Sequence, residues 1–273
     1  TIWVNDTAGN VGQNSTTFRI DTVIPAVSIT TPTNNTNTSR TGLNVNYTFS
    51  DISGIDSCWY SNDTYLANKS LGSGGGGNCV NITNITWSEG LHNVTIWVND
   101  TAGNIAQNST TFRIDTGVPA LAILFPTNYT NSSNINLDVN FTAGDVSSIS
   151  SCWYSNDTMT SNTTITCGTN ITTITWSERQ HNVTIWANDS ANNINFSSVT
   201  FFVDSITPLI SYGTGTGNDG ANVSRNWIYV NVSVTETNPR NITFKLYNTT
   251  GAVNITTFSM ASQTANNTIN WTS

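Results

Sequence analysis

Basic residues are scarce in this chain, whose 273 residues include only eight Lys and Arg against 16 Asp and Glu. The formal net charge is −8, and charged residues make up 9% of the sequence, where about 25% is usual for a soluble domain. A protein that binds nucleic acid needs a basic patch that neutralises phosphates. The composition therefore excludes nucleic acid as an expected partner.

Long apolar runs are also missing. The longest run, residues 118–125, is far shorter than the roughly 18 residues that span a bilayer. We therefore expect no membrane contact within this segment. The chain has no initiator Met or signal-like start and opens in the middle of a repeat, so we expect it to be a segment of a longer protein.

Catalytic motifs are missing as well. The two histidines, His92 and His181, stand in the same H-N-V-T-I-W context without a Ser or Asp constellation of triad type. The glycine run 74–77 lacks the Lys and the strand-to-helix context of a phosphate-binding loop, so we interpret it as a flexible loop. We expect no catalytic residues and no enzyme activity.

What the chain does contain is a repeat. Residues 1–10, TIWVNDTAGN, return unchanged at 95–104, which is 94 residues later, and return in altered form at 184–193, a further 89 residues on. The block CWYSNDT opens at Cys58 and again at Cys152, also 94 residues apart. This spacing indicates one unit copied in tandem, close to the roughly 100 residues of a β-sandwich module.

Apolar residues alternate with polar ones within each repeat, and no helical period occurs. Across residues 43–49, for example, Leu43, Val45, Tyr47 and Phe49 share one face. The other strands expected in the first repeat are 27–30, 56–62, 79–87, 93–99 and 110–114. About seven short strands predict two antiparallel sheets packed face to face, in an all-β fold.

An Asp followed four residues later by a Pro marks each repeat boundary, at Asp21, Asp115 and Asp204. We therefore divide the chain into residues 1–21, the C-terminal hairpin of a split repeat that includes Phe18 and Ile20; residues 22–115 (repeat one); residues 116–204 (repeat two); and residues 205–273 (the third unit), which lacks the last two strands. Two explanations stay open. Either the sequence is a window on a longer array, or the hairpin of one molecule completes the third unit of the next in a head-to-tail fibre.

Two cysteines fall in each of the two full repeats, Cys58 with Cys79 and Cys152 with Cys167. A pair present in each copy predicts an intra-repeat disulfide, which is typical of an oxidising, extracellular setting. Zinc ligation is the alternative, but two cysteines without a nearby His make a poor zinc site.

Sugar is expected to keep this low-charge surface solvated. Roughly 28 of about 41 asparagines stand in N-x-S/T sequons, more than random placement or strand alternation would produce. The alternative is that the sequons are a by-product of Asn/Thr-rich strands. The candidate acceptors are Asn46, Asn62, Asn93, Asn99, Asn140, Asn156, Asn182, Asn188 and Asn231.

The NDTAGN element, the D-T-x-x-P boundary and the seven-strand rhythm resemble the tandem immunoglobulin-like repeats of prokaryotic cell-surface proteins. The density of sequons is similar to that of archaeal surface-layer and filament proteins. The resemblance covers nearly the whole chain and implies tandem immunoglobulin-like β-sandwich domains arranged end to end, with a structural or adhesive role outside the cell. One departure is that antibody-type domains join their second and sixth strands by a disulfide, whereas these cysteines fall on the third strand and soon after it.

Tryptophans recur on what we expect to be an outer strand face. Trp97 and Trp186 alternate with apolar neighbours on the sixth strand, and the third strand beside it carries Trp59 and Trp153. We expect Trp97 beside Trp59, and Trp186 beside Trp153, where they could contact glycan, a neighbouring subunit or a ligand sugar. The alternative is that Trp59 and Trp153 face the core.

Acidic residues gather at the repeat ends. They include Asp51, Asp100 and Asp115, with counterparts at Asp6, Asp21, Asp145, Asp189 and Asp204. Asp commonly makes turns by accepting hydrogen bonds from its own backbone, so our first expectation is no metal. The alternative is calcium held by hard oxygen ligands at Asp51, Asp100 and Asp115.

These features favour a structural extracellular protein, a glycosylated repeat of a cell-surface filament, surface layer or stalk. Its expected partners are copies of itself in a head-to-tail or lattice assembly. The alternative is an adhesin that binds carbohydrate or protein through exposed Trp residues or loops. A secreted hydrolase with accessory repeats would need a catalytic domain outside this segment.

Overall fold

A computed structural model describes residues 1–63, 68–73, 78–157, 159, 161–260 and 264–272. The regular elements among these residues are strands, and none of the described residues belongs to a helix that could cross a membrane. By its internal contacts the chain divides into two compact units. One comprises residues 1–120, 143–152 and 187–195, and the other comprises 121–142, 153–186 and 196–273, so the division passes through repeat two.

The N-terminal hairpin is shorter than the sequence predicts. β1 (Ile2–Asn5) pairs antiparallel with β2 (Val11–Asn14), in the register of the later copy of the motif. The expectation that Phe18 and Ile20 continue this hairpin is wrong, because β2 ends before them. In the later copy of the motif, the first strand begins at Gly90 and pairs with residues as far as Ile114, the counterpart of Ile20.

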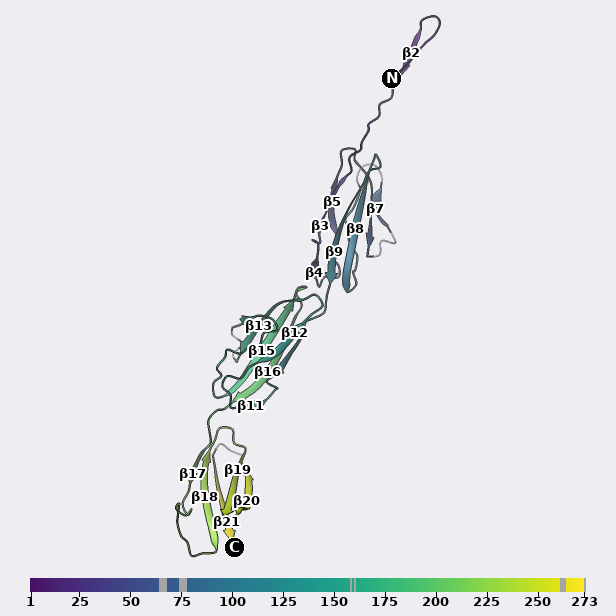
Figure 1. Cartoon of the computed structure of the whole chain (residues 1–273). Coiled ribbons are helices and arrows are strands. Elements are labelled where there is room, and N and C mark those ends of the chain that lie inside the picture. The colour runs from purple at the N-terminus through teal and green to yellow at the C-terminus, as the bar shows by residue number, and fades with distance from the viewer. Residues whose placement is uncertain (64–67, 74–77, 158, 160, 261–263, 273) are drawn as a thin grey trace. The chain divides into compact units, whose positions relative to one another are not determined.

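Repeat one folds into two facing sheets (Figure 1). The larger sheet has the strand order β4-β9-β8-β6-β7, and the smaller pairs β3 with β5. Ile82 adds an isolated bridge opposite Val45. The strands are β3 (Ala26–Thr31), β4 (Thr36–Thr38), β5 (Asn46–Ser50), β6 (Ile55–Asn62), β7 (Lys69–Ser73), β8 (Gly90–Asp100) and β9 (Ile105–Ile114).

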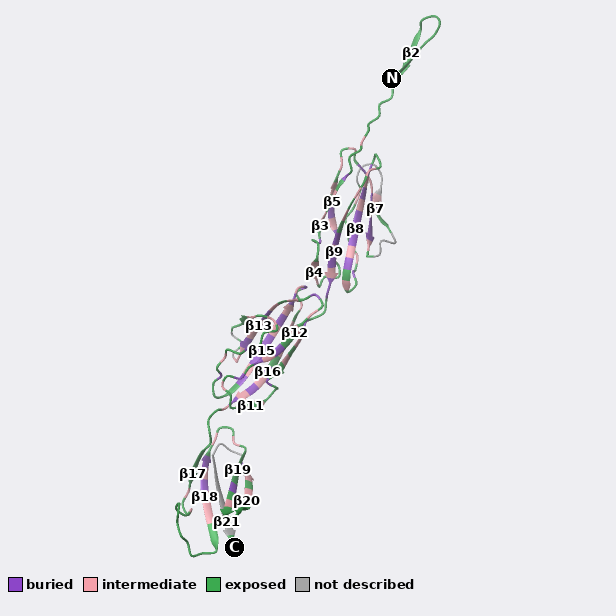
Figure 2. Ribbon diagram, in the orientation of Figure 1, coloured by how far each residue is buried: buried purple, intermediate pink, exposed green. Residues whose placement is uncertain are grey.

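The core of repeat one lies between these sheets and follows the predicted alternation. Val45 and Tyr47 are buried, and Leu43 and Phe49 pack against them as expected for one face. Figure 2 shows buried residues along β8 and β9, and in β9 they lie in the C-terminal half of the strand. These two strands supply a large share of the core, namely Val94, Ile96, Val98, Phe112 and Ile114. A sandwich without them therefore loses much of its apolar interior.

One strand prediction in repeat one is wrong, and two strands were not predicted. Residues 79–87 are irregular apart from one bridge, since Asn84 takes a φ of 60° that interrupts an extended run. The strand that follows β6 is instead β7, which pairs with β6. The parallel pairing of β4 with β9 was not predicted, because three polar residues carry no apolar alternation. The glycine run 74–77, interpreted as a loop, lies outside the described residues.

Repeat two copies this order. Its larger sheet is β11-β16-β15-β13-β14, its smaller sheet pairs β10 with β12, and β11 again runs parallel to β16. The strands are β10 (Ala120–Phe125), β11 (Thr130–Ser132), β12 (Asn140–Gly144), β13 (Ile149–Asn156), β14 (Thr163–Ile165), β15 (Gln180–Asp189) and β16 (Ile194–Val203). Val183, Ile185, Phe201 and Val203 are fully buried, like their counterparts in repeat one.

The third unit is a smaller pair of sheets, β17-β18-β21 and β19-β20. Its strands are β17 (Leu209–Tyr212), β18 (Trp227–Thr235), β19 (Asn241–Asn248), β20 (Gly251–Ser259) and β21 (Thr264–Thr272). Among the described residues its buried core is limited to Val232, Val234, Phe244 and Met260. The fold is thus all-β, with tandem immunoglobulin-like sandwiches as predicted, while the proposed boundaries at residues 21, 115 and 204 stay a prediction.

Candidate functional site

A disulfide joins Cys58 of β6 to Cys79, with the Cα atoms 5.7 Å apart. The Val80 N–H donates to the Leu71 carbonyl, which holds the segment after β7 against the sheet. Cys152 and Cys167 are also disulfide-bonded, and no cysteine in the described part of the chain is free. The predicted intra-repeat pairing is confirmed in repeat one, where the bond closes the excursion that contains β7.

Two stacked tryptophan pairs lie outside the core. Trp59 of β6 is opposite Trp97 of β8, and their ring centroids are 6.3 Å apart with planes 5° from parallel. Trp153 and Trp186 stack with the same separation and an angle of 7°. All four rings are half-buried, so the outer-face orientation holds and the alternative in which Trp59 and Trp153 face the core is wrong.

The core tryptophans are instead Trp87 and Trp176, to which strand alternation assigned no role. Trp87 is 3% exposed, and its indole Nε1–H donates to the Leu43 carbonyl at 2.8 Å. Its ring meets Phe112 edge-on at a centroid distance of 5.0 Å. Trp176 repeats both contacts in repeat two. The W-S-E sequence that the two segments share is the feature that could have identified these tryptophans as equivalent core residues.

The two histidines are buried beside these tryptophans. Nδ1 of His92 lies 3.1 Å from Oδ2 of Asp63, and Nε2 donates to the Ser88 carbonyl oxygen at 2.8 Å. His181 repeats both contacts in repeat two. Each histidine ties a turn aspartate to the beginning of a long strand, which is a structural role.

The repeated N-D-T-A-G-N motif forms a turn around its aspartate. Oδ1 of Asp100 accepts the backbone N–H of Ala102 and of Asn104, and Oδ2 accepts the Asn104 side-chain amide at 2.8 Å. Burial alone would raise the pKa of Asp100, but these hydrogen bonds outweigh burial and lower the pKa below its ordinary value. Asp6 and Asp189 accept the same set of bonds, so the turn-forming interpretation is confirmed.

Six of the aspartates at the repeat ends form two clusters, and their membership differs from the predicted group of Asp51, Asp100 and Asp115. Asp51 and Asp100 meet Asp21, and one carboxylate oxygen of each lies within 4.8 Å of the others. Asp115 belongs to a second cluster of the same size, with Asp145 and Asp189. Each cluster joins a boundary residue, a residue just after the second strand of the smaller sheet and the turn aspartate. Three carboxylates at this spacing could hold a hard cation.

The sequon asparagines chosen from the strands are all half-buried. Nδ2, the atom to which sugar is attached, donates to Thr200 Oγ1 in Asn182 and to the Thr214 carbonyl in Asn231. Solvent-exposed sequon asparagines occur elsewhere, at Asn68, Asn162, Asn222 and Asn254. Exposure therefore favours this second group as acceptors.

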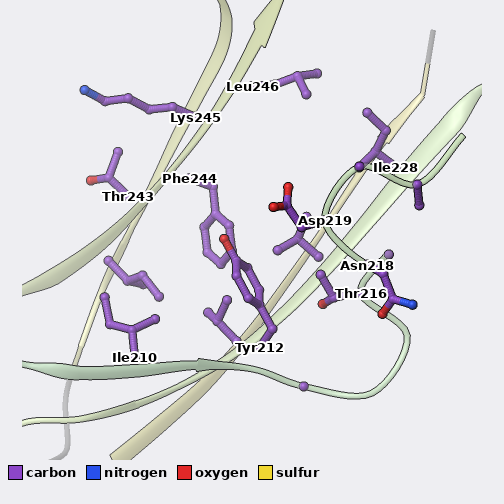
Figure 3. A pocket seen from close by; sticks show the side chains of 17 residues that line it. Ile210, Tyr212, Thr216, Asn218, Asp219, Ile228, Thr243, Phe244, Lys245 and Leu246 are labelled. Carbon is purple, nitrogen blue, oxygen red and sulfur yellow. The ribbon is translucent and has the colours of Figure 1, made fainter.

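A cavity of about 1060 Å³ with a mixed polar and apolar lining opens between the sheets of the third unit. Its lining includes Ile210, Tyr212, Ile228 and Phe244. Figure 3 shows Phe244 pointing into this space from β19 and Tyr212 pointing into it from β17. Among the described residues, the third unit has four buried core residues, whereas repeat one has thirteen.

The N-terminal hairpin segment presents the complementary feature, an apolar face in solvent. Phe18 is 82% exposed, whereas Phe112, its counterpart 94 residues later, is fully buried in repeat one. Ile2 and Ile20 are also mostly exposed, although their counterparts belong to the same core. The hairpin segment therefore carries core residues without the core that they fill elsewhere.

No family model and no curated protein matches this chain. Among solved structures, it is similar to the fibronectin(III)-like modules of CbhA from Clostridium thermocellum, with 16% identity, 66% of this chain and 94% of that chain covered, and a TM-score of 0.39. It is also similar to a tetra-tandem repeat in the extending region of a large adhesion protein (16% identity, 98% and 71% covered, TM-score 0.38). A bacterial ice-binding adhesin gives 14% identity, 91% and 88% covered, and a TM-score of 0.31. Similarities this low do not extend to function.

Proposed function

We propose that this chain is a structural repeat segment of an extracellular surface protein, each sandwich being a rigid element of a filament, surface layer or stalk. The observation that carries the proposal is that the same side-chain packing recurs inside successive sandwiches. The centroid distance from Trp87 to Phe112 is 5.0 Å and that from Trp176 to Phe201 is 4.9 Å, and each pair has a buried histidine beside it. Retention of the same packed interior in successive copies favours a mechanical role.

The extracellular location is supported by the cysteines. All four are disulfide-bonded, which is typical of oxidising compartments and unusual in the cytosol. The exposed sequons and the 9% content of charged residues agree with a surface that is solvated by sugar. Glycosylation is accordingly part of the proposal.

Self-association is supported by the exposed hairpin segment and the open cavity of the third unit. In repeat one the residues that correspond to Ile2 and Phe18 fill the space between two sheets. A hairpin segment from a second copy has the apolar residues needed to fill the cavity beside Phe244. We therefore propose copies of this chain as its partners.

Electron microscopy of the purified chain tests this function. Regular fibres or sheets are the expected result, and Phe18→Asp is expected to disperse them because it places a charge in the apolar contact. Leu91→Asp, at an exposed position of β8, is the matched control and should leave the assemblies intact.

The stacked Trp59–Trp97 pair favours the second candidate function, an adhesin, because half-buried aromatic rings can stack on sugar. Dispersed particles that bind a glycan array, with binding lost in Trp59→Ala, would support the adhesin and contradict the structural role.

Sugar attachment makes a separate prediction for the protein isolated from its native source. Peptides of this segment that contain the exposed acceptors Asn68, Asn162, Asn222 and Asn254 are expected to be heavier than their bare sequences, because they carry glycan. Asn182 is expected to be unmodified, because its Nδ2 donates a hydrogen bond to Thr200 Oγ1. Peptide mapping by mass spectrometry checks both points, and bare masses at all four exposed acceptors would end the proposal of glycosylation.

A further inference from the structure

Two boundary aspartates, Asp115 and Asp21, each have a buried carboxyl oxygen without a hydrogen-bond partner, which points to a ligand. Asp115 is only 2% exposed, and its Oδ1 accepts the Gly117 N–H at 3.0 Å, whereas its Oδ2 is buried without a hydrogen-bond partner. Asp21 repeats this arrangement, since Oδ1 accepts the Val23 N–H and Oδ2 is buried without a partner. A carboxyl oxygen that is buried without a hydrogen-bond partner is unfavourable, so two such atoms at equivalent positions indicate an absent partner.

Positive side chains do not supply that partner. Within the described part of the chain, the ion pairs join His92 to Asp63, and Arg179 and His181 to Asp157. None of these pairs includes a carboxylate of the two clusters. Each cluster therefore concentrates three acidic groups within 4.8 Å without a neutralising cation from the protein.

The remaining hydrogen bonds orient the carboxylates. In repeat two, Oδ1 of Asp145 accepts the N–H and the hydroxyl of Ser147, and Asp189 is held by the turn described above. The Asn193 amide donates to Oδ2 of Asp189 and also to the backbone carbonyl of Asp115, which links the turn to the boundary segment. Orientation before binding lowers the cost of assembling a metal site.

The third boundary aspartate provides an internal comparison. Oδ2 of Asp204 accepts the Asn238 side-chain amide at 2.6 Å, and Oδ1 accepts the Ile206 N–H. Among the described residues Asp204 belongs to no group of three acidic side chains. The unpartnered oxygen thus accompanies the complete set of three aspartates and is not a general property of boundary residues.

We propose that each three-aspartate cluster binds one Ca²⁺ ion. Calcium takes oxygen ligands at about 2.3–2.6 Å, so two of its ligands are at most about 5 Å apart, which agrees with the separation in the clusters. Magnesium requires shorter distances, near 2.0–2.1 Å, and a nearly ideal octahedron. The bound ion ties the boundary residue, Asp21 or Asp115, to the end of the sandwich that follows it.

Calcium titration of the chelator-treated chain tests the proposal. Isothermal titration is expected to give two ions per chain, with Kd values of about 10⁻⁴ to 10⁻³ M, the range of extracellular modules. The melting temperature is expected to rise with calcium concentration, because the ion binds the folded state. No thermal shift and no binding heat at about 10 mM calcium, ten times the upper Kd, would overturn the proposal.

The Asp115→Asn variant tests whether Asp115 is a metal ligand or only a structural residue. The variant is expected to bind one ion instead of two and to lose the calcium-dependent shift of repeat two, while its melting temperature without calcium is unchanged or higher because a repulsive charge has gone. Asp138→Asn, an exposed position in the same repeat, is the matched control and should still bind two ions. An Asp115→Asn chain that retains both ions would contradict the assignment.

Discussion

Replacement of Trp87 by alanine is expected to lower the free energy of unfolding of repeat one by about 3–5 kcal/mol. The indole is almost fully buried between the sheets and packs against Phe112, so its removal leaves a cavity lined by apolar groups. The Leu43 carbonyl also loses the donor that satisfies it. Both effects act in the same direction, which places this substitution among the most destabilising that the chain offers.

Hydrogen exchange measured by mass spectrometry over β8 and over β15 resolves the two repeats, because a global melting curve would merge them. Protection is expected to fall in β8 and to stay unchanged in β15. Trp59→Ala is the matched control, since it removes a half-buried indole from the outer face and forfeits a stacked pair worth about 0.5–1.5 kcal/mol beyond the area that it buries. Equal losses of protection in the two variants would show that Trp87 is not the core residue we describe.

Removal of the Cys58–Cys79 disulfide is expected to have the second largest effect, a destabilisation of repeat one by about 3 kcal/mol. The bond closes a loop with a sequence separation of 21 residues, and its loss frees that loop in the unfolded chain. Replacement of both cysteines by alanine is preferable to serine, because Cys58 is 1% exposed and a hydroxyl there would be buried.

Denaturant unfolding of this double variant, followed by hydrogen exchange over β8 with and without reductant, checks the expectation. The variant should be insensitive to reductant within repeat one, whereas the unsubstituted chain should be destabilised by reduction. The equivalent replacement of Cys152 and Cys167 is the matched control and should leave the protection of β8 unchanged. If the variant and the unsubstituted chain unfold at the same denaturant concentration, the disulfide does not stabilise repeat one.

Local pattern was sufficient for much of the architecture. Alternation identified the buried face of residues 43–49, and the spacing of CWYSNDT and its cysteines predicted a disulfide within each repeat. Pattern failed at residues 79–87, where the positive φ of Asn84 interrupts a run that looks like a strand. Pattern also failed where burial or pairing is set by distant segments, since β4 forms only because β9 offers an edge. Trp87 was not identified as a core residue for the same reason, since its burial depends on Phe112 and Leu43.

By itself the sequence determined that one unit is copied, that the copies are all-β, and which cysteines share a repeat, because each of these follows from spacing and alternation along the chain. Only the tertiary structure decided that Asp21, Asp51 and Asp100 meet, and that Asp115 belongs with Asp145 and Asp189. The physical reason is that these carboxylates lie on loops whose positions are set by the packing of strands far apart in sequence.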